Sequence, residues 1–400
     1  MVSHRISAMN ESVTLKMGEK TKQLVKQGVN IIDFTVGEPD FDTPDFIKAA
    51  AVCALKDGFT KYTPASGIPE LKNAIIHKLK KDNHLSYTPS QIIVSCGAKH
   101  SIFNAIQTLC NPGDEIIIPT PYWVSYPEQV KVSEAHCVYV PTDEHNQFQL
   151  TARAIAECIS RRTKVIIINS PNNPTGTVYT AKNLKDIAEL TARKNIFVIS
   201  DEIYEKLVYR GTRHISIASF GKKIKDLTIL INGVSKAYAM TGWRIGFAAG
   251  PEYLVKLMGR LQSHTTSNPT SIAQAAAVVA YQKGETSVRK MVRAFQARRD
   301  YLLNRLSEMP YLSCHRPTGA FYVFPDISKL FGKFYKGSII KDSLGLTELL
   351  LTQAHIAVVP GIAFGNDKHI RFSYATSLRN IREGMNRLAD FLREITDGNH

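Results

Sequence analysis

Short runs of apolar residues, rich in β-branched side chains, recur between residues 91 and 251 of the chain. The apolar positions are consecutive rather than alternating, which is typical of strands buried on both faces of a sheet. Segments with a helical pattern separate the runs, so we expect the strands to be mostly parallel. The pattern predicts an α/β fold, a mostly parallel seven-stranded sheet flanked by helices, with strands in residues 91–97, 114–119, 137–141, 164–171, 197–204, 227–236 and 244–251.

Polar and glycine-rich segments follow four of these runs. They read CGAKHS (96–101), SPNNPTG (170–176), DEIY (201–204) and SK (235–236). Ligands of open α/β sheets bind outside the carboxyl ends of the strands, where functional loops collect. These four segments are therefore expected to meet at one edge of the sheet and to form a site there.

The pattern changes after about residue 285, where a long, basic, amphipathic helix covers residues 287–309. Short β-rich segments follow at residues 321–327, 356–361 and 370–375, and a last helix ends the chain. This order predicts a smaller α+β domain that the N-terminal residues complete. We expect a large cofactor-binding domain at 45–285 and a small substrate-closing domain formed by 1–44 and 286–400.

Composition narrows the classes of function only slightly. The 400 residues are 44% hydrophobic, which is enough for a sizeable core. The formal net charge of +15 suits nucleic acid, an anionic membrane surface or small acidic ligands, although a solvated basic surface is its commonest cause. No helix-turn-helix, zinc-finger or RNA-recognition signature is present, so no nucleic-acid partner is expected.

The cysteines and the apolar stretches indicate where the protein is located and whether it binds a metal. The six cysteines are scattered and form no CxxC pair, which suggests neither a zinc site nor a disulfide framework, and no metal is expected. The first residues lack the apolar core of a secretory signal, and no window approaches the roughly 20 apolar residues that cross a bilayer. A cytoplasmic protein without a membrane partner is predicted.

One lysine at a predicted strand end could act as a nucleophilic amine. Lys236 follows Ser235 and precedes small residues, although a single lysine in such a place is more often a surface residue of a turn. An acid, a phenol, an amide and a cation stand at neighbouring places, namely Asp201, Tyr204, Asn173 and Arg244. Such a set satisfies pyridoxal 5′-phosphate, whose aldehyde needs a lysine, whose ring nitrogen needs a carboxylate and whose phenolic oxygen needs donors.

The segments that carry these residues resemble the class I pyridoxal-phosphate aminotransferases of the aspartate aminotransferase fold. The resemblance rests on SPNNPTG, SDEIY and SKAYAMTGWRIG, in this order. It extends over nearly the whole chain through VGEPDFDTP (36–44), KYTPASGIPEL (61–71), PYWVSYPE (121–128) and RFSYATS (371–377). Any one of these segments could arise by chance, but seven in the right order are a strong signal.

For the cofactor ring, the resemblance implies that Lys236 forms an aldimine and moves the proton between the substrate Cα and the cofactor carbon. Asp201 is expected to pair with the ring nitrogen and to keep it charged. Tyr204 and Asn173 are expected to bond the phenolic oxygen. Trp123 is expected to stack on the ring.

For the cofactor phosphate, the resemblance implies a cradle at the turn of Gly97, Ala98 and Lys99, where N–H groups at a helix start face the anion. Ser235 and Arg244 complete the cradle. Tyr62 matches a tyrosine that reaches the phosphate of a neighbouring subunit, so a homodimer with shared active sites is implied.

For the substrate, the resemblance assigns the α-carboxylate to Arg371 and to the backbone of Gly37, beside Trp123 and Asn173. One branch of the family reads the distal carboxylate with an arginine shortly before an SNP sequence, but residues 261–269 contain no arginine. Bacterial enzymes of a second branch, which the chain resembles more closely, use a lysine in the phosphate turn and a serine near the N-terminus. Lys99 and Ser12 occupy those positions.

The resemblance favours transamination of L-aspartate with 2-oxoglutarate to oxaloacetate and L-glutamate, by a ping-pong mechanism through a Lys236 aldimine. An aromatic amino acid or prephenate aminotransferase stays open, because a single ammonium discriminates less sharply than a bidentate arginine. A cofactor-binding regulator without turnover is the alternative from another class. The expected partners are small amino and 2-oxo acids and a second copy of the chain.

Overall fold

The computed structural model describes residues 2–11 and 13–397 of the chain. Within them the largest sheet has seven strands, in the spatial order β2-β8-β7-β6-β5-β3-β4. In that order they are Ile92–Ser95, Gly246–Ala249, Thr228–Gly233, Phe197–Asp201, Thr163–Asn169, Glu115–Thr120 and His136–Pro141. Neighbours are parallel, except that β8 is antiparallel to β2 and β7. The predicted fold class is confirmed, and every strand lies within one residue of its predicted segment.

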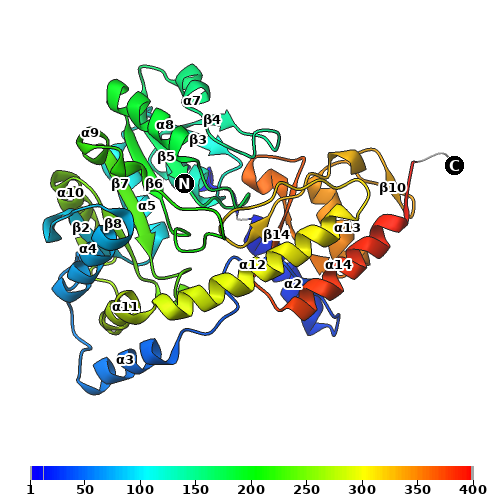
Figure 1. Cartoon of the computed structure of the whole chain (residues 1–400). Coiled ribbons are helices and arrows are strands. Elements are labelled where there is room, and N and C mark those ends of the chain that lie inside the picture. The colour runs from blue at the N-terminus through cyan, green and yellow to red at the C-terminus, as the bar shows by residue number, and fades with distance from the viewer. Residues whose placement is uncertain (1, 12, 398–400) are drawn as a thin grey trace.

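Helices cover both faces of this sheet (Figure 1). Ile116 and Ile118 of β3 belong to one apolar cluster, and Ile117 between them belongs to another. Successive side chains of a strand point to opposite faces, so a run of apolar residues fills two cores. One face carries α5 (Ala98–Leu109), α6 (Ser125–Val132) and α10 (Glu252–Ser263). The other carries α7 (Ala152–Cys158), α8 (Ala181–Lys194) and α9 (Lys222–Lys225), and, beside β2 and β8, α3 (Asp45–Lys56), α4 (Pro69–Asn83) and α11 (Ser271–Lys283).

A second group of elements lies beside the sheet and joins the two ends of the chain (Figure 1). Strand β1 (Ile32–Asp33) pairs in parallel with β12 (Ile356–Ala357), and β14 (Ile370–Ser373) pairs antiparallel with β9 (Tyr322–Val323) and β13 (Val359–Pro360). The helices of this group are α2 (Val13–Lys26), α12 (Glu285–Ser307), α13 (Ser343–Gln353) and α14 (Leu378–Arg393). The shared core explains why N-terminal residues pack with C-terminal ones. Division into domains at residues 44 and 285 stays a prediction.

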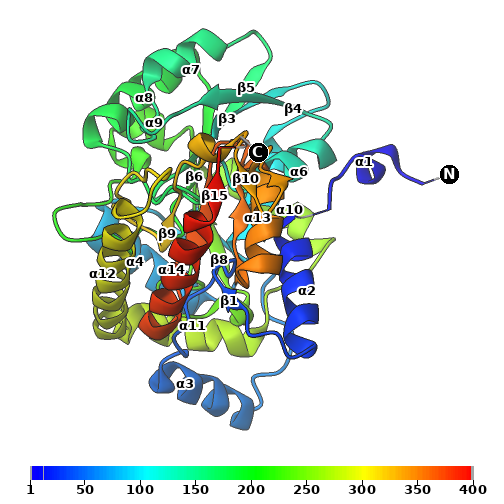
Figure 2. The ribbon, with the colours of Figure 1, turned by 90° about the vertical axis from the view of Figure 1, so that its right-hand side faces the viewer.

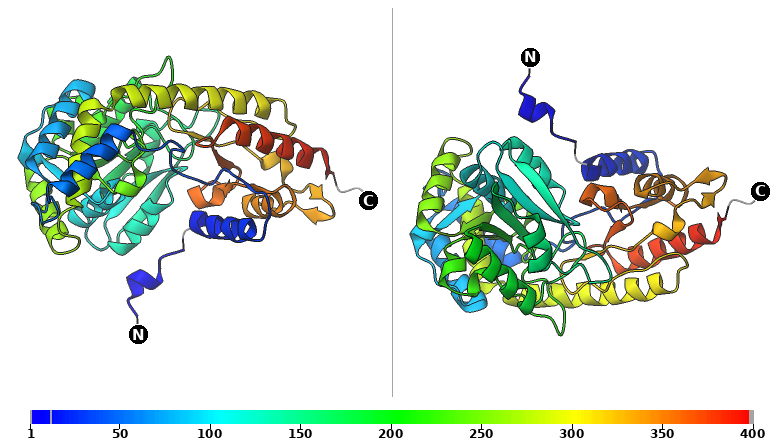
Figure 3. Two further views of the ribbon diagram at one scale, coloured as in Figure 1. Left: turned by 90° about the horizontal axis from the view of Figure 1, so that it is seen from below. Right: turned by 90° about the horizontal axis from the view of Figure 1, so that it is seen from above.

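The chain begins outside this body. Helix α1 (His4–Ser7) projects from the rest of the chain, and all its side chains are exposed (Figure 2, Figure 3). Beyond this helix, the backbone N–H of Asn10 donates a hydrogen bond to Glu128 at 2.9 Å. None of the described helices has the length and apolar character needed to span a membrane.

The strand ends fix where a site can form. Strands β2, β5, β6 and β7 are mutually parallel in direction and end at Ser95, Asn169, Asp201 and Gly233, whereas antiparallel β8 begins at the same edge with Gly246. Because parallel strands deliver their following loops to one edge, four polar segments distant in sequence come together there.

Candidate active site

A cavity of about 640 Å³ opens at this edge, between the sheet and the elements beside it. Eleven of the residues singled out in the sequence line it: Gly37, Ala98, Lys99, Trp123, Asn173, Asp201, Tyr204, Ser235, Lys236, Arg244 and Arg371. Gly97 is not in the lining but touches the guanidinium of Arg244. Strand ends far apart in the chain thus supply one concave polar site, as the segment pattern predicted.

Asp201, the last residue of β6, is the buried acid of the cavity, with only 4% of its surface exposed. Its Oδ2 accepts a hydrogen bond from the hydroxyl of Tyr126 at 2.7 Å, and its Oδ1 accepts one from the backbone N–H of Ile203 at 3.2 Å. Burial raises the pKa of Asp201 to about 6, although both hydrogen bonds lower it. A cationic partner in the cavity would favour the charged carboxylate.

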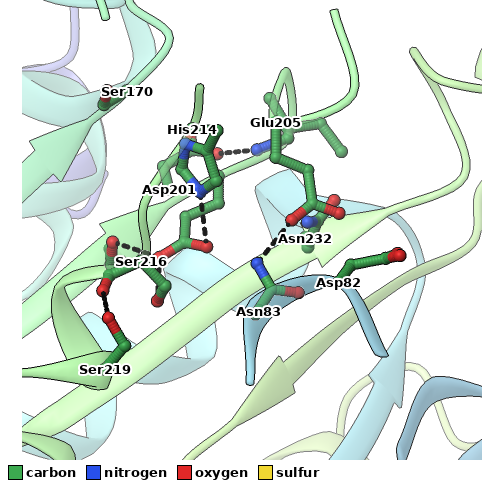
Figure 4. Close-up of polar contacts among 12 residues, drawn as sticks. Asp82, Asn83, Ser170, Asp201, Glu205, His214, Ser216, Ser219 and Asn232 are labelled. Atoms are coloured by element: carbon green, nitrogen blue, oxygen red, sulfur yellow. Dashed lines mark hydrogen bonds and ion pairs between the residues drawn. The ribbon is translucent and has the colours of Figure 1, made fainter. Parts of the chain in front are cut away.

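Buried charges pack behind Asp201, where Figure 4 shows His214, Ser216, Glu205 and Asn83 near it. Glu202 accepts hydrogen bonds from the hydroxyl of Ser216 at 2.6 Å and pairs with His214 at 3.0 Å. Glu205 forms an ion pair with Lys78, and it accepts a bond from Asn83 at 2.8 Å. The chain therefore supplies a cation to this acidic cluster.

Lys236 brings the amine into the cavity. Its Nζ donates a hydrogen bond to the carbonyl oxygen of Gly37 at 2.6 Å and lies 6.0 Å from the centre of the Tyr204 ring. Burial lowers the pKa of Lys236 to about 8, Glu38 raises it, and Arg244 and Arg371 lower it further. A lysine poised in this range can both take up and release a proton near neutral pH.

Arg371, on β14, is the buried cation at the other side of the cavity. Its Nη1 donates to the side-chain oxygen of Asn173 at 2.9 Å and its Nη2 donates to the carbonyl of Thr35 at 2.7 Å. Its Nε has no hydrogen-bond partner among the described residues. The guanidinium also lies 4.5 Å from the centre of the Tyr322 ring, whose hydroxyl is 2.9 Å from that of Tyr204. Burial lowers the pKa of Arg371, yet an arginine stays charged, so the cavity holds a permanent site for an anion.

The turn between β2 and α5 forms a second anion-binding place. Gly97 has φ +86°, and a Cβ there would collide with the guanidinium of Arg244, whose Cζ would be 2.9 Å away. A Cβ on Gly246 of β8 would collide with the backbone of Gly97 and Ala98. These two glycines let the start of helix α5, the guanidinium and β8 approach closely, so that first-turn N–H groups face the cavity.

Comparison with known proteins shows the family to which the chain belongs. The sequence model of the family described as aminotransferase class I and II matches residues 29–388. The chain belongs to the class I aminotransferases, in the aspartate aminotransferase family.

Two relatives illustrate the likeness in sequence. The aspartate aminotransferase of Bacillus sp. (strain YM-2) is 45% identical over 393 residues, which cover 98% of this chain and 99% of the relative. A protein of Aquifex aeolicus (strain VF5) named probable aspartate/prephenate aminotransferase is 45% identical over 98% of this chain and 99% of its own length.

Two solved structures illustrate the likeness in fold. The aspartate aminotransferase from Rhizobium meliloti matches with a TM-score of 0.96 and 41% identity over 99% of this chain and 100% of that one. The aspartate aminotransferase from Thermus thermophilus with maleate matches with a TM-score of 0.93 and 41% identity over 98% and 100%. As an aminotransferase of this family, the protein is an enzyme that uses pyridoxal 5′-phosphate and acts on amino and oxo acids.

The residues of this aminotransferase fit that cofactor. Lys236 would supply the amine for its aldehyde, and the buried Asp201 would supply a carboxylate that a charged ring nitrogen complements. The turn at Gly97, where a Cβ would fill the space beside Arg244, would supply an anion cradle. The amine, the carboxylate and the anion cradle lie in or beside one cavity. Their chemistry matches the aldehyde, the ring nitrogen and the phosphate of the cofactor, respectively.

Three residues that the sequence singled out need separate mention. Lys99 lines the cavity of this aminotransferase, with its Nζ 5.0 Å from the centre of the Trp123 ring, and burial lowers its pKa. Tyr62 is 91% exposed and does not line the cavity of its own chain. Ser12 lies outside the described residues.

Three polar residues at the site were missed from the sequence. Tyr126 bonds Asp201, Tyr322 bonds Tyr204 and lies under Arg371, and Asn169 lines the cavity. The signal for Tyr126 was present, because it follows Trp123 by one helical turn in PYWVSYPE. Tyr322 sits in an apolar strand, where a tyrosine is normally a core residue, and only the fold places its hydroxyl in the cavity.

Proposed function

We propose that this aminotransferase converts L-aspartate and 2-oxoglutarate to oxaloacetate and L-glutamate by a ping-pong mechanism. The observation that carries the proposal is the pairing of Lys236 with Arg371 in one cavity, an amine with a pKa lowered to about 8 and a buried guanidinium with an unpartnered Nε within the described chain. Transamination of an amino acid requires a proton acceptor beside its Cα and a cation at its carboxylate. Lys236 and Arg371, which line the same cavity, provide these two groups.

When bound beside Lys236, the cofactor would supply an electron sink for the pair left when the Cα–H bond of the substrate breaks. Lys236 takes the Cα proton on Nζ and returns it to a neighbouring carbon, which its lowered pKa allows in both directions near neutral pH. Asp201 would keep the ring nitrogen charged, because its carboxylate is buried and fixed by hydrogen bonds from Tyr126 and the backbone of Ile203. Tyr204 and Asn173 orient the phenolic oxygen.

Arg371 holds the α-carboxylate of either substrate. Two of its three nitrogens are fixed by Asn173 and Thr35, which sets the plane of the guanidinium before a substrate arrives. A preset plane favours a carboxylate with one orientation, and it turns the Cα–H bond toward Lys236. The carbonyl oxygen of Gly37 accepts the hydrogen bond from Lys236, and we propose that the backbone of Gly37 also contacts the α-carboxylate.

We propose that Lys99 and Ser12 bind the distal carboxylate of the substrate. Lys99 lines the same cavity as Arg371, with its Nζ 5.0 Å from the centre of the Trp123 ring, so a diacid held by Arg371 would share the cavity with this ammonium. The structure of the Thermus thermophilus relative contains maleate, a dicarboxylate, which supports a dicarboxylate-binding site in this fold. A flexible ammonium tolerates other acids, and relatives named aspartate/prephenate aminotransferase support prephenate or an aromatic amino acid as the second candidate.

We also propose a homodimer in which Tyr62 completes the phosphate cradle of the partner subunit. Tyr62 is 91% exposed and outside its own cavity, while the side chain of Arg244 is exposed at the cradle. The α1 segment projects from the rest of the chain and offers an arm that a partner can receive (Figure 3). Residues 1–44 and 286–400 are proposed to move as the substrate-closing domain, and the six unpaired cysteines support a reducing, cytoplasmic location.

A half-reaction screen tests the proposed substrates. Purified holoenzyme is mixed with one amino acid at a time, without an oxo acid, and the cofactor spectrum is followed to its amine form. Aspartate and glutamate are expected to give full conversion with the highest rate constants. Faster conversion with phenylalanine or tyrosine would replace the substrate assignment, and no conversion with any amino acid would favour a regulator without turnover.

A further inference from the structure

Three side chains outside the active site gather a histidine and two acids. Glu144 follows β4, Asp326 follows β9 and His369 directly precedes β14. One ligand atom from each lies within 4.8 Å of the other two. The Nε2 of His369 is 3.9 Å from Oδ2 of Asp326. The sequence predicted no metal site, because these residues stand far apart in the chain and form no motif.

The hydrogen bonds of His369 fix which ring nitrogen carries the proton. Its Nδ1 is 3.1 Å from Oδ1 of Asn366, and that oxygen also accepts the backbone N–H of Lys368 at 3.2 Å. The backbone donor sets the orientation of the Asn366 amide, so Nδ1 of His369 must be the donor. In the neutral ring, Nε2 then presents a lone pair. Metal-binding histidines are held in this way, with the other nitrogen donating to a protein oxygen.

That lone pair has nothing to bond within the described chain. His369 is only 4% exposed, its ring stacks on Phe324 at 4.7 Å, and Nε2 has no hydrogen-bond partner among the described residues. A buried acceptor without a donor is unfavourable, and a bound cation would offset that cost.

The two acids add negative charge, and in the described chain neither Glu144 nor Asp326 forms an ion pair with a lysine or arginine. Glu144 accepts hydrogen bonds from the hydroxyl of Ser313 at 3.0 Å and from the backbone of His315. The cluster of Glu202, Glu205 and His214 differs, because Lys78 already neutralises it. The electron pairs at Glu144, Asp326 and His369 therefore converge without a cation.

We propose that Glu144, Asp326 and His369 bind a divalent transition-metal ion, with Zn²⁺ as the best-suited ion. One imidazole nitrogen and two carboxylate oxygens suit zinc better than magnesium or calcium, which prefer oxygen ligands alone. Tetrahedral zinc ligands stand about 3.3–3.5 Å apart, so the 3.9 Å gap must shrink by about half an ångström. Asp326 is partly exposed and follows a short strand, so its carboxylate can make this shift. Glu144, whose ligand atom lies within 4.8 Å of the other two, is on a partly exposed loop and can approach the same ion, and water completes the coordination.

The site would join two parts of the enzyme. Glu144 belongs to the loop after β4 of the main sheet, whereas Asp326 and His369 flank strands β9 and β14. His369 stands two residues before Arg371 on the same backbone, so an ion here would fix the start of the strand that carries the carboxylate-binding arginine. Occupancy would stabilise the folded chain in proportion to zinc binding.

Isothermal titration of metal-free holoenzyme with ZnCl₂ tests the proposal, because binding is read without substrate or turnover. Wild type is expected to bind one Zn²⁺ per chain at this site, and Glu144→Gln and Asp326→Asn are expected to weaken it by at least about 10-fold. His145→Gln, an exposed neighbour of Glu144, is the matched control and should bind as wild type does. MgCl₂ should give no comparable binding.

Thermal unfolding adds a second measurement. Zinc should raise the melting temperature of wild type and of His145→Gln but not that of Glu144→Gln, whose partly exposed position makes loss of folding a poor explanation. Equal zinc affinity in wild type and both acid variants would overturn the proposal, and so would a wild type that binds no zinc. The zinc measurements do not depend on transamination, so a failure of the proposed transaminase activity would not change their outcome.

Discussion

The hydrogen bond from Tyr126 to Asp201 shows how a single residue can set the chemistry of the cofactor site. Asp201 was identified from the sequence because an acid closes a buried strand, but its partner comes from helix α6, and only the fold brings the hydroxyl to 2.7 Å. The same limit applies to Tyr322. Sequence motifs therefore predict the groups that are chemically distinctive, and miss the ordinary tyrosines that hold them.

Tyr126→Phe should weaken cofactor binding by about 10- to 100-fold, because a hydrogen bond to a charged group contributes roughly 1.5–3 kcal/mol. The bond favours the carboxylate, so its loss raises the pKa of Asp201 above the value of about 6. Cofactor affinity falls as the pH drops through that pKa, and in the variant the fall should begin at higher pH. Equilibrium titration with pyridoxal phosphate across pH measures both effects. Tyr139→Phe, on the exposed side of β4, is the control, and an unshifted pH profile in Tyr126→Phe would count against the role of Tyr126.

Lys99→Ala should reduce kcat/KM for aspartate more than for phenylalanine, by about 10-fold or more, because only aspartate has a distal carboxylate to lose its partner. Steady-state kinetics with both amino acids measure the ratio. Equal losses for the two substrates would mean that Lys99 serves the phosphate turn and does not recognise the substrate.

At the scale of elements, each of the seven strands overlaps its predicted segment because each is an apolar run buried in the sheet, and the ends differ by up to three residues. Their direction was predicted less completely. Strand β8 runs antiparallel, and its composition gives no sign of this, since Gly246 to Ala249 is as buried as the parallel strands beside it. The short strands β1 and β12 pair through residues over 300 positions apart, which local pattern does not determine.

Gly246→Ala should disturb the phosphate turn through the strand that supports it. The new Cβ would overlap the backbone at Gly97 and Ala98, which cannot rotate away, so the start of helix α5 must shift. Overpacking of this kind costs roughly 1–3 kcal/mol, and we expect about 10-fold weaker pyridoxal phosphate binding with a lower melting temperature. Gly259→Ala, in helix α10 with no atom within 4 Å of the new Cβ, should bind the cofactor normally. Normal binding by both variants would contradict the proposed cradle.

At the scale of the whole molecule, the cavity of one chain holds a place for every part of the cofactor, yet Tyr62 lies outside it. The sequence resemblance assigned Tyr62 to the phosphate of a neighbouring subunit, and its 91% exposure leaves it available for that role. An exposed tyrosine has no other visible reason to affect cofactor binding in its own chain. This makes the assembly testable through one side chain.

Tyr62→Phe should weaken pyridoxal phosphate binding by about 5- to 10-fold, because it deletes one hydrogen bond to an anion. Sedimentation velocity should give a dimer for both wild type and variant. A monomer in solution, or unchanged cofactor affinity in the variant dimer, would contradict shared active sites.

The most direct test of the central claim follows the proton that Lys236 moves. Wild-type holoenzyme in D₂O should exchange the Cα hydrogen of L-aspartate for deuterium, read by proton NMR, while Lys236→Ala, loaded with the cofactor, should exchange it at least about 100-fold more slowly, the contribution of a positioned base. Circular dichroism establishes that the variant is folded. Exchange at the wild-type rate in folded Lys236→Ala would contradict the account, because the proton would then be moved by another group.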